Sequence, residues 1–418
     1  MSAERRTAGF KEWTAVDDAR RALLDRVSPV ERTASVAVGD AGGRVLAARV
    51  TAPRPVPHYD RVTVDGYAVR ASDTAGAGDR SPARLDLTGA GQTDDGSPTD
   101  GQGRATRVEA GTAVAVASGA ALPDGADAVV RVEGVDRTPD GLAVREAVAP
   151  GTGVRATGAD VAAGATLAAA GATLDPGTRS LALAAGVETL PCRDRPRVAI
   201  QPVGDRLVAS DPGTGDVVET DAAAVAGAVG RWGGSARRRD PVVPDGVEAA
   251  IRDPGADLLV TVGATGVGPR DLAPDAVDAL GTLAVHGVAV RPGRTAGVGT
   301  VAETPLLLLP GPPAACAVAA GLFLRPAVRR CAGRSVDTDR ATAATLDRKV
   351  ASGPGVQTVA GVELTAAPDG PVADPVLIGG GGGLSDLAAI DGWVTVPPAR
   401  EGLDAGASVA VADWGWSA

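Results

Sequence analysis

The feature that most constrains this fold is a short apolar run that passes directly into a glycine-rich loop. Residues 258–262 read Leu-Leu-Val-Thr-Val, a pattern typical of a strand that is buried on both faces. Gly263, Gly266 and Gly268 follow, and glycines allow tight turns that aim backbone N–H groups at an anion. Pro269 favours the first position of a helix, whose N-terminus suits negative charge. The stretch therefore predicts an anion-binding strand–loop–helix unit.

Asp271 lies just inside the predicted helix and has two interpretations. A carboxylate in the first turn complements the helix dipole without any further role. The same carboxylate is also suited to hold a hard metal ion beside a bound phosphate. The stretch alone leaves both interpretations open.

From Pro196 onward the chain alternates short strands and helices, which predicts a three-layer α/β domain with a mostly parallel sheet. We expect strands at 198–203, 258–262, 283–290 and 305–309, and helices at 222–229, 247–251, 276–280 and 313–328. Ligands bind such sheets at the carboxyl ends of the strands. The loops expected there are 204–206, 263–271, 291–294 and 310–313.

Composition narrows the classes of function. The formal net charge is −10, which argues against broad nucleic-acid binding because that needs a basic face. The three cysteines and two histidines have no zinc-ligand spacing, so any metal is expected to be a hard ion on oxygen ligands. Neither an apolar run of membrane-spanning length nor a signal-peptide pattern is found. We therefore expect a cytoplasmic protein without a membrane partner.

Both tyrosines of the chain, Tyr59 and Tyr67, lie in the segment 57–74. An Asp65-Gly66 pair between β-formers is compatible with a plain hairpin turn and with a polar loop at a functional site. The segment resembles the Pro-x-x-x-x-Ser-x-Met-Asp-Gly-Tyr-Ala-Val signature of molybdopterin molybdenumtransferases, the MoeA-type proteins related to the gephyrin E domain. Residues 65–69 match, whereas Val62 and Val64 stand where the family has Ser and Met.

A second motif in residues 117–133 extends this resemblance. It is similar to the family's Thr-Gly-Ala-x-x-Pro-x-Gly-Ala-Asp-Ala-Val-Val-x-x-Glu, in which Ser118 keeps a hydroxyl and Glu133 keeps the acid. By themselves, residues 126–132 predict only an ordinary strand after a glycine turn. The length of the match is what makes it specific. Asp160 also matches the acid of the family's Gly-Glu-Asp-Val segment.

The loops of the α/β domain resemble the family's molybdopterin-binding domain in order and spacing. Residues 263–271 stand for Gly-Gly-x-Ser-x-Gly-x-x-Asp, and residues 310–313 for Pro-Gly-Asn-Pro. The second Gly is Ala264 and the Ser is Gly266, although Thr265 supplies a neighbouring hydroxyl.

Charged positions of these loops also depart from the family. Arg291 and Arg294 replace the two lysines of Lys-Pro-Gly-Lys, which keeps the charge and suits bidentate oxyanion binding. In the family's Thr-Gly-Asp-Glu-Leu, Arg206 replaces the Glu, so a base stands where the family has an acid. Near the C-terminus, Ser385 matches the family's Ser before a Leu-Ala pair.

The resemblance covers nearly the whole chain and implies a multidomain α/β plus β fold. The expected parts are an elongated N-terminal or linker domain (1–50 and 150–192), an inserted β-rich domain (51–149), a three-layer α/β molybdopterin-binding domain (193–334) and a C-terminal β-barrel-like domain (335–418). It also implies a homodimer.

The resemblance implies a role in molybdenum cofactor biosynthesis. The family inserts molybdate into adenylyl-molybdopterin, releases AMP and uses Mg²⁺; tungstate is the alternative oxyanion. A second hypothesis is a catalytically impaired paralogue that carries molybdopterin or the finished cofactor. A nucleotide-binding oxidoreductase is disfavoured because the glycine loop lacks the dinucleotide spacing. Molybdopterin adenylyltransferase and cofactor-accepting enzymes are further expected partners.

The implied site residues fall into three groups. The expected catalytic acids are Asp65, Glu133, Asp240 and Asp271, of which Asp240 and Asp271 are also the expected metal ligands. The expected substrate-binding residues are Ser118, Gly204, Asp205, Gly263, Thr265, Gly266, Gly268, Arg291, Arg294, Pro310, Gly311, Pro313 and Ser385. The resemblance implies that Asp65 and Glu133 reach the site across a dimer interface.

Overall fold

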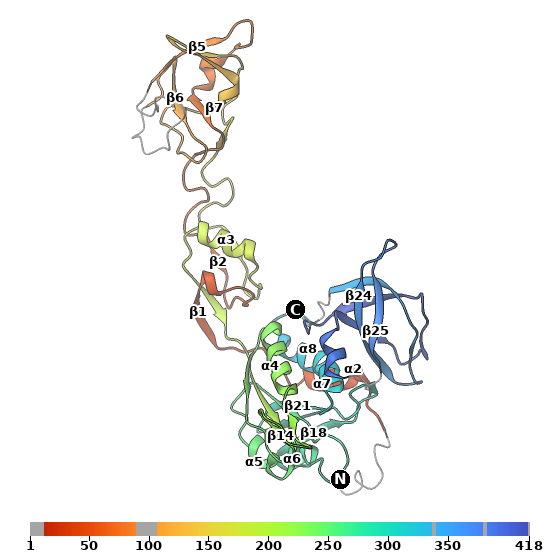
Figure 1. Cartoon of the computed structure of the whole chain (residues 1–418). Helices are drawn as coiled ribbons and strands as arrows, with labels where there is room; N and C mark the ends of the chain where they lie inside the picture. Colours follow the sequence, from red (N-terminus) through yellow and green to blue (C-terminus); the bar gives the residue numbers. More distant parts are fainter. Residues whose placement is uncertain (1–11, 89–106, 337–339, 379–382, 417–418) are drawn as a thin grey trace. The chain divides into compact units, whose positions relative to one another are not determined.

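The computed structural model describes residues 12–88, 107–336, 340–378 and 383–416. The chain forms two compact units (Figure 1). Unit 1 comprises residues 1–34, 43–45 and 192–418, and unit 2 comprises residues 35–42 and 46–191. Each unit has hydrophobic cores of its own.

The α/β part of unit 1 is built on a six-stranded sheet in the order β16-β13-β17-β21-β20-β18. Its strands are β13 (Arg197–Pro202), β16 (Ser235–Arg238), β17 (Leu258–Val262), β18 (Gly281–His286), β20 (Gly297–Val301) and β21 (Thr304–Leu309). The first four in the sheet run parallel, and β20 is antiparallel to both of its neighbours. The predicted mostly parallel sheet is therefore correct, but β16 and β20 were not predicted.

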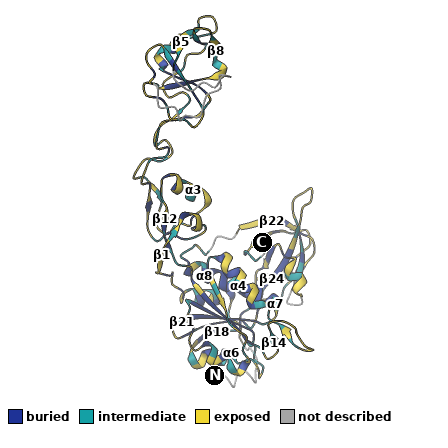
Figure 2. Ribbon diagram, turned by 60° about the vertical axis from the view of Figure 1, so that its left-hand side comes forward, coloured by how far each residue is buried: buried dark blue, intermediate teal, exposed yellow. Residues whose placement is uncertain are grey.

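Helices cover both faces of this sheet, so the predicted three layers are present (Figure 1). The helices are α2 (Val16–Leu24), α4 (Asp221–Trp232), α5 (Val247–Ile251, preceded by the 3₁₀ turn η4, Pro244–Gly246), α6 (Ala273–Leu280), α7 (Pro313–Ala319) and α8 (Arg325–Cys331). Successive residues of β17 point to opposite faces: Val260 packs with α4 and α7, and Leu259 packs with α5 and α6. All of β17 is buried, as its apolar run predicts. Its neighbour β21 is buried from Pro305 to Leu309 (Figure 2).

The predicted helix 313–328 is wrong in one respect. A π-helical turn, η5 (Ala320–Leu324), separates α7 from α8. A Cβ on Gly321 in this turn would lie 2.2 Å from Cε3 of Trp414, so the indole packs directly on the helix backbone. The predicted strand 283–290 is also too long, because it ends at His286 and the chain turns at Gly287, whose φ is +96°.

The C-terminal part of unit 1 is a β structure with one short helix. Its elements are β19 (Val290–Arg291), β22 (Arg340–Leu346), β23 (Val350–Ala351), β24 (Gln357–Thr365), β25 (Val372–Ile378), α9 (Leu384–Ala388), β26 (Gly392–Val396), β27 (Gly402–Leu403) and β28 (Ser408–Asp413). The main sheet has the order β19-β24-β25-β22-β28-β26. Trp393 and Trp414 stack at 5.1 Å between ring centroids and join the core that includes α7 and α8.

Unit 2 contains a second six-stranded sheet, in the order β7-β4-β6-β5-β9-β8. Its strands are β4 (Gly66–Val69), β5 (Ala83–Leu87), β6 (Thr112–Val116), β7 (Ala128–Arg131), β8 (Val135–Thr138) and β9 (Gly141–Val144). Tyr67 and Ala68 alternate between two separate clusters, so both faces of the sheet are packed.

Shorter elements complete the fold. They are β1 (Thr33–Ala37) paired with β12 (Thr189–Arg193), β2 (Val50–Thr51) with β11 (Thr166–Ala168), β3 (Arg61–Val62) with β10 (Val154–Arg155), β14 (Leu207–Val208) with β15 (Val217–Val218), helix α3 (Pro176–Ala184), and the 3₁₀ turns η1 (Val38–Asp40), η2 (Ala71–Thr74) and η3 (Val132–Gly134). Within the described ranges, none of the helices has the length and apolar character needed to cross a bilayer.

Candidate active site

A cavity of about 400 Å³ opens at the carboxyl ends of β13, β17 and β21. This is the edge of the sheet where the strand order predicts a ligand site. The lining residues are Pro202, Val203, Leu207, Asp216, Val217, Val218, Glu219, Thr220, Asp221, Val262, Gly263, Gly311, Pro313 and Leu384. Of the predicted site residues, Gly263, Gly311 and Pro313 lie in this wall.

Two loop backbones meet in this wall. Gly263 has a φ of +94°, and a Cβ there would lie 2.4 Å from the Val203 carbonyl oxygen. Its N–H donates to the Leu309 carbonyl at 2.9 Å, which links the ends of β17 and β21. A Cβ on Gly311 would lie 3.5 Å from the Gly263 Cα. Glycine at position 263 is needed because of its positive φ and the close approach of its backbone to the Val203 carbonyl.

Asp271 closes the glycine loop on itself. Its Oδ2 accepts the Gly268 N–H at 2.8 Å, just before α6 begins. A Cβ on Gly266 would lie 2.5 Å from the same oxygen. The glycine that replaces the family's Ser therefore leaves room for the Asp271 carboxylate.

Thr265 connects the glycine loop to the loop at 291–294. Its side chain is 3% exposed, and its hydroxyl shares a hydrogen bond of 2.9 Å with the hydroxyl of Thr295. Its carbonyl lies 2.8 Å from Nε2 of His286, at the end of β18. The hydroxyl predicted to bind substrate is thus engaged in holding two loops together.

The two arginines predicted to bind an oxyanion have different surroundings. Arg291 is exposed on β19, in register with Thr358 of β24, so the C-terminal sheet fixes its backbone. Arg294 is also exposed, and its guanidinium carbon lies over the Trp13 ring at 5.2 Å from the centroid. Sequence reasoning did not connect Trp13 with this loop.

Two charged residues of the loop after β13 have partners from other segments. Nε of Arg270 donates to the Asp205 carboxylate at 2.7 Å, so the acid predicted to bind substrate is paired. Arg206, the base at the family's acid position, lies 3.1 Å from Asp216 and donates to the Thr214 carbonyl at 2.9 Å. The Arg206 side chain therefore fastens β14 to the segment that leads into β15.

Sequence reasoning missed the acids that line the cavity at the N-terminus of α4, Glu219 and Asp221. Glu219 accepts the Ala222 N–H at 2.6 Å, and its side chain is 6% exposed. Burial raises the pKa of the Asp221 carboxyl to about 6, and the nearby Glu219 carboxylate adds to the rise. Two acids directly before an apolar helix were the available signal, because acids favour helix N-termini.

The expected metal ligands are Asp240 and Asp271. Asp240 is exposed after β16, and its carbonyl accepts the Gln201 side-chain amide at 2.8 Å. In the part of the chain that the structure describes, no three His, Cys, Asp or Glu side chains are grouped to hold a metal ion. Protein-bound Mg²⁺ commonly takes only one or two carboxylates and completes its shell with substrate phosphates and water. The two acids therefore fit such an ion in type and number.

The predicted acids of unit 2 form a separate group. Asp65 Oδ1 accepts the Ser118 N–H at 2.8 Å, and the Asp65 carbonyl accepts the Val132 N–H at 3.3 Å. Glu133 is exposed in η3, directly after Val132. The structure thus brings together Asp65, Ser118 and Glu133 from two motifs that are distant in the sequence.

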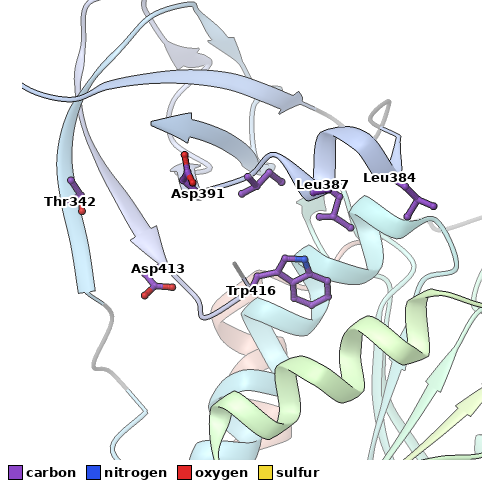
Figure 3. Close-up of a pocket in the computed structure, with 8 residues that line it drawn as sticks. Thr342, Leu384, Leu387, Asp391, Asp413 and Trp416 are labelled. Atoms are coloured by element: carbon purple, nitrogen blue, oxygen red, sulfur yellow. The ribbon is translucent and has the colours of Figure 1, made fainter. Parts of the chain in front are cut away.

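A second cavity of about 750 Å³ lies in unit 1 between α9 and the C-terminal strands (Figure 3). Its walls include Thr342, Asp391, Asp413 and Trp416. Leu384 lines both cavities and is 53% exposed. The predicted Ser385 follows it on α9 and is exposed. The C-terminal part therefore borders the cavity of the α/β part.

The chain is similar to known proteins along most of its length. Three family profiles match, described as the MoeA N-terminal region (domain I and II) at residues 14–186, a probable molybdopterin binding domain at 199–330 and the MoeA C-terminal region (domain IV) at 343–414. Molybdopterin molybdenumtransferase 2 of Mycobacterium tuberculosis is 35% identical over 317 residues, covering 72% of this chain and 76% of that protein. The chain belongs to the MoeA-type molybdopterin molybdenumtransferase family.

Other members of the MoeA-type family agree with this assignment. The molybdopterin molybdenumtransferase of Synechococcus elongatus is 32% identical over 314 residues, covering 72% of this chain and 75% of that protein. A solved structure of the molybdopterin biosynthesis MoeA protein from Pyrococcus horikosii has a TM-score of 0.77 at 28% identity, covering 96% of this chain and 99% of that one. The MoeA-type fold, the transferase class and the role in molybdenum cofactor biosynthesis are therefore confirmed.

Proposed function

We propose that this chain inserts molybdate, or tungstate, into adenylyl-molybdopterin and releases AMP. The observation that carries the proposal is the cavity at the carboxyl ends of β13, β17 and β21, in which the loops at 263 and 311 meet. Backbone N–H groups of loops at such an edge suit a phosphorylated substrate. The charged residues that line the cavity are Asp216, Glu219 and Asp221, so Arg291 and Arg294 are proposed to act from outside this lining. We also propose that the chain has the four domains expected from the sequence.

The proposed roles follow from the chemistry of each group. The glycine loop at 263–268 presents backbone to the substrate phosphate, and Asp271 keeps that loop closed through the Gly268 N–H. Arg291 and Arg294 hold the oxyanion by charge-assisted hydrogen bonds. Such fixed charges stabilise negative charge that develops as the adenylyl–phosphate bond breaks.

Mg²⁺ is part of this proposal, with Asp240 and Asp271 as its protein ligands. When bound, the ion neutralises charge on the substrate phosphates. We further propose that Asp65, Ser118 and Glu133 complete the site from a second copy of the chain. Molybdopterin adenylyltransferase and cofactor-accepting enzymes are the proposed partners before and after the reaction.

The test is to incubate the purified chain with adenylyl-molybdopterin, Mg²⁺ and molybdate and to follow AMP by chromatography. We expect AMP release by the parent protein, and loss of release in Asp271→Ala. Arg291→Ala should weaken oxyanion binding by about 1.5–3 kcal/mol, the range for hydrogen bonds to charged groups. AMP release that survives in Asp271→Ala and Arg291→Ala together would place the reaction elsewhere.

The carrier hypothesis predicts a different result in the same experiment. It draws on Arg206, the base at the family's acid position, whose guanidinium pairs with Asp216. A carrier would bind molybdopterin without Mg²⁺ and release no AMP, and Arg206→Glu would weaken that binding. The transferase hypothesis predicts that Arg206→Glu leaves turnover intact or raises it.

A further inference from the structure

The pair formed by Trp13 and Arg294 is not explained by the proposed reaction. Aromatic residues make up 2% of the chain, and Trp13 is 38% exposed. A large, partly exposed indole is an unusual use of a scarce residue, because burial is what usually stabilises it. One contact of its ring is with the Arg294 guanidinium, 5.2 Å from the ring centroid.

The backbone holds Trp13 in this place. The Thr14 N–H donates to the Gly287 carbonyl at 3.1 Å, and the Ala289 N–H donates to the Thr14 carbonyl at 2.8 Å. These two bonds form a parallel bridge between the segment before α2 and the chain that leads into β19. Thr14, the neighbour of Trp13, is thus bonded to the chain just before the loop that carries Arg294. Trp13 therefore lies beside that loop.

The other side of the same loop is fixed as well. Thr295, directly after Arg294, shares its hydroxyl hydrogen bond with Thr265 of the glycine loop. The Arg294 side chain thus contacts the Trp13 ring, and the next residue, Thr295, is hydrogen-bonded to the glycine loop. The chain on both sides of Arg294 is therefore held.

The chemistry of the pair leaves Arg294 able to bind an anion. A cation over a ring is attracted by the negative face of the ring, and this attraction uses none of its hydrogen-bond donors. A guanidinium has five N–H donors in its own plane, arranged to match two oxygens of an oxyanion. Ordering the long side chain in advance removes entropy that binding would otherwise lose.

We propose that Trp13 is the positioning residue of the oxyanion site: it orients Arg294 to bind a tetrahedral oxyanion, either molybdate or a substrate phosphate. This inference rests on the proposed function, since it takes Arg294 as an oxyanion ligand. It also gives a reason for arginine at this position where the family has lysine, because a planar guanidinium stacks on an indole better than an ammonium does.

The competing explanation is that Trp13 only attaches the segment before α2 to the rest of unit 1. A double-mutant cycle separates the two explanations. Sodium molybdate and, in a separate arm, inorganic pyrophosphate are titrated by calorimetry into the full chain and into Trp13→Leu, Trp13→Phe, Arg294→Ala and Trp13→Leu/Arg294→Ala. The melting temperature of each variant is measured alongside.

We expect Trp13→Leu to weaken binding by about 3- to 10-fold, the range for the entropy of immobilising one long side chain on binding. Trp13→Phe, which keeps an aromatic face, should recover most of that loss. In the Arg294→Ala background, where Arg291 still binds, Trp13→Leu should have no further effect. Weakening of only the molybdate arm assigns Arg294 to the metal oxyanion, and weakening of only the pyrophosphate arm assigns it to the substrate phosphate.

Two results would overturn the inference. One is unchanged affinity in Trp13→Leu, and the other is an equal loss with and without Arg294, accompanied by a lower melting temperature. Failure of the proposed function looks different, because the parent protein would then bind neither anion. A parent that binds molybdate while Trp13→Leu binds it equally well removes only the role of Trp13.

Discussion

Gly263 and Gly311 lie close together in the cavity wall, yet the structure requires glycine at only one of them. At Gly263 the backbone has a φ of +94°, and an added Cβ would lie 2.4 Å from the Val203 carbonyl oxygen. At Gly311 the nearest atom to an added Cβ is 3.5 Å away, an ordinary contact. The two positions therefore form a matched pair for mutagenesis.

Gly263→Ala should lower the free energy of unfolding by roughly 2 kcal/mol or more, because strain at positive φ is added to a backbone clash. Gly311→Ala should lower it by less than about 1 kcal/mol, since a single methyl group meets no close atom. Urea denaturation of both variants checks the difference. Equal losses would show that Gly263 does not have the positive φ and the close approach to the Val203 carbonyl described above.

Asp221 predicts a specific pH dependence of stability. Its pKa is raised from 3.8 to about 6, so the folded chain holds this proton more tightly than the unfolded chain does. Stability therefore falls as the pH rises from 3.8 to about 6, and the loss is complete above that range. Asp221→Asn removes the ionisation and should stabilise the protein above this range.

The expected gain for Asp221→Asn at pH 8 is about 1 kcal/mol, since solvent screens a partly exposed carboxylate. Below pH 3.8 the parent carboxyl is protonated in both states, so the variant and the parent should unfold alike. Thermal unfolding across this range measures the difference. A gain that is the same at low and high pH would contradict burial of the Asp221 charge.

At the scale of elements, the segment joining β14 and β15 depends on a pair that the family's motif does not contain. Arg206 lies 3.1 Å from Asp216, and both side chains are partly exposed. Residues 216–221 line the cavity, so the pair lies next to the proposed site. A surface ion pair contributes at most about 1 kcal/mol, so the effect of breaking it should be local.

Arg206→Glu should place two carboxylates together and raise amide hydrogen exchange in residues 207–218, with little change in the global melting temperature. The swapped variant Arg206→Asp/Asp216→Arg should restore slow exchange, because it restores opposite charges. Hydrogen-exchange mass spectrometry measures both variants. Unchanged exchange in Arg206→Glu would show that the pair does not hold this segment.

The sequence predicts elements well where the local pattern alone decides the structure. The apolar run at 258–262 becomes β17 with the same bounds, because a buried strand needs only such a run. The π-helical turn at 320–324 could not be predicted, since it accompanies the packing of Trp414 on Gly321 from the far end of the chain. β20 was missed because its glycines weaken the strand pattern; a Cβ on Gly299 would lie 2.4 Å from the Thr282 carbonyl oxygen.

The candidate site likewise contains residues that the sequence predicts and side-chain contacts that it does not. Gly263, Gly311 and Pro313 could be placed by motif and strand order, since the carboxyl ends of parallel strands share one edge. The pairing of Asp205 with Arg270 and the contact of Arg294 with Trp13 depend on side chains that meet only after folding. The spacing of residues along a single sequence does not predict these contacts.

At the scale of the whole molecule, we expect a homodimer. The proposed phosphate-binding loops belong to unit 1, whereas Asp65 and Glu133 belong to unit 2. If a second copy supplies these acids, then two inactive variants should complement each other. Light scattering should give a dimeric mass at high salt.

Mixing Asp65→Ala with Asp271→Ala and allowing subunits to exchange should restore about a quarter of the parent activity, since half of the dimers are mixed and each has one intact site. Each variant alone should be inactive. No recovery after exchange, with mixed dimers confirmed by mass, would place both acids in the site of a single chain.

The most direct test of the central claim is a single turnover with enzyme in excess over adenylyl-molybdopterin. With Mg²⁺ and molybdate present, AMP and protein-bound molybdenum are measured in the same samples over time. The account predicts that both rise together in equal amounts, and that neither rises when Asp271→Ala replaces the parent protein. Tight binding of molybdopterin without any AMP or molybdenum product would contradict it.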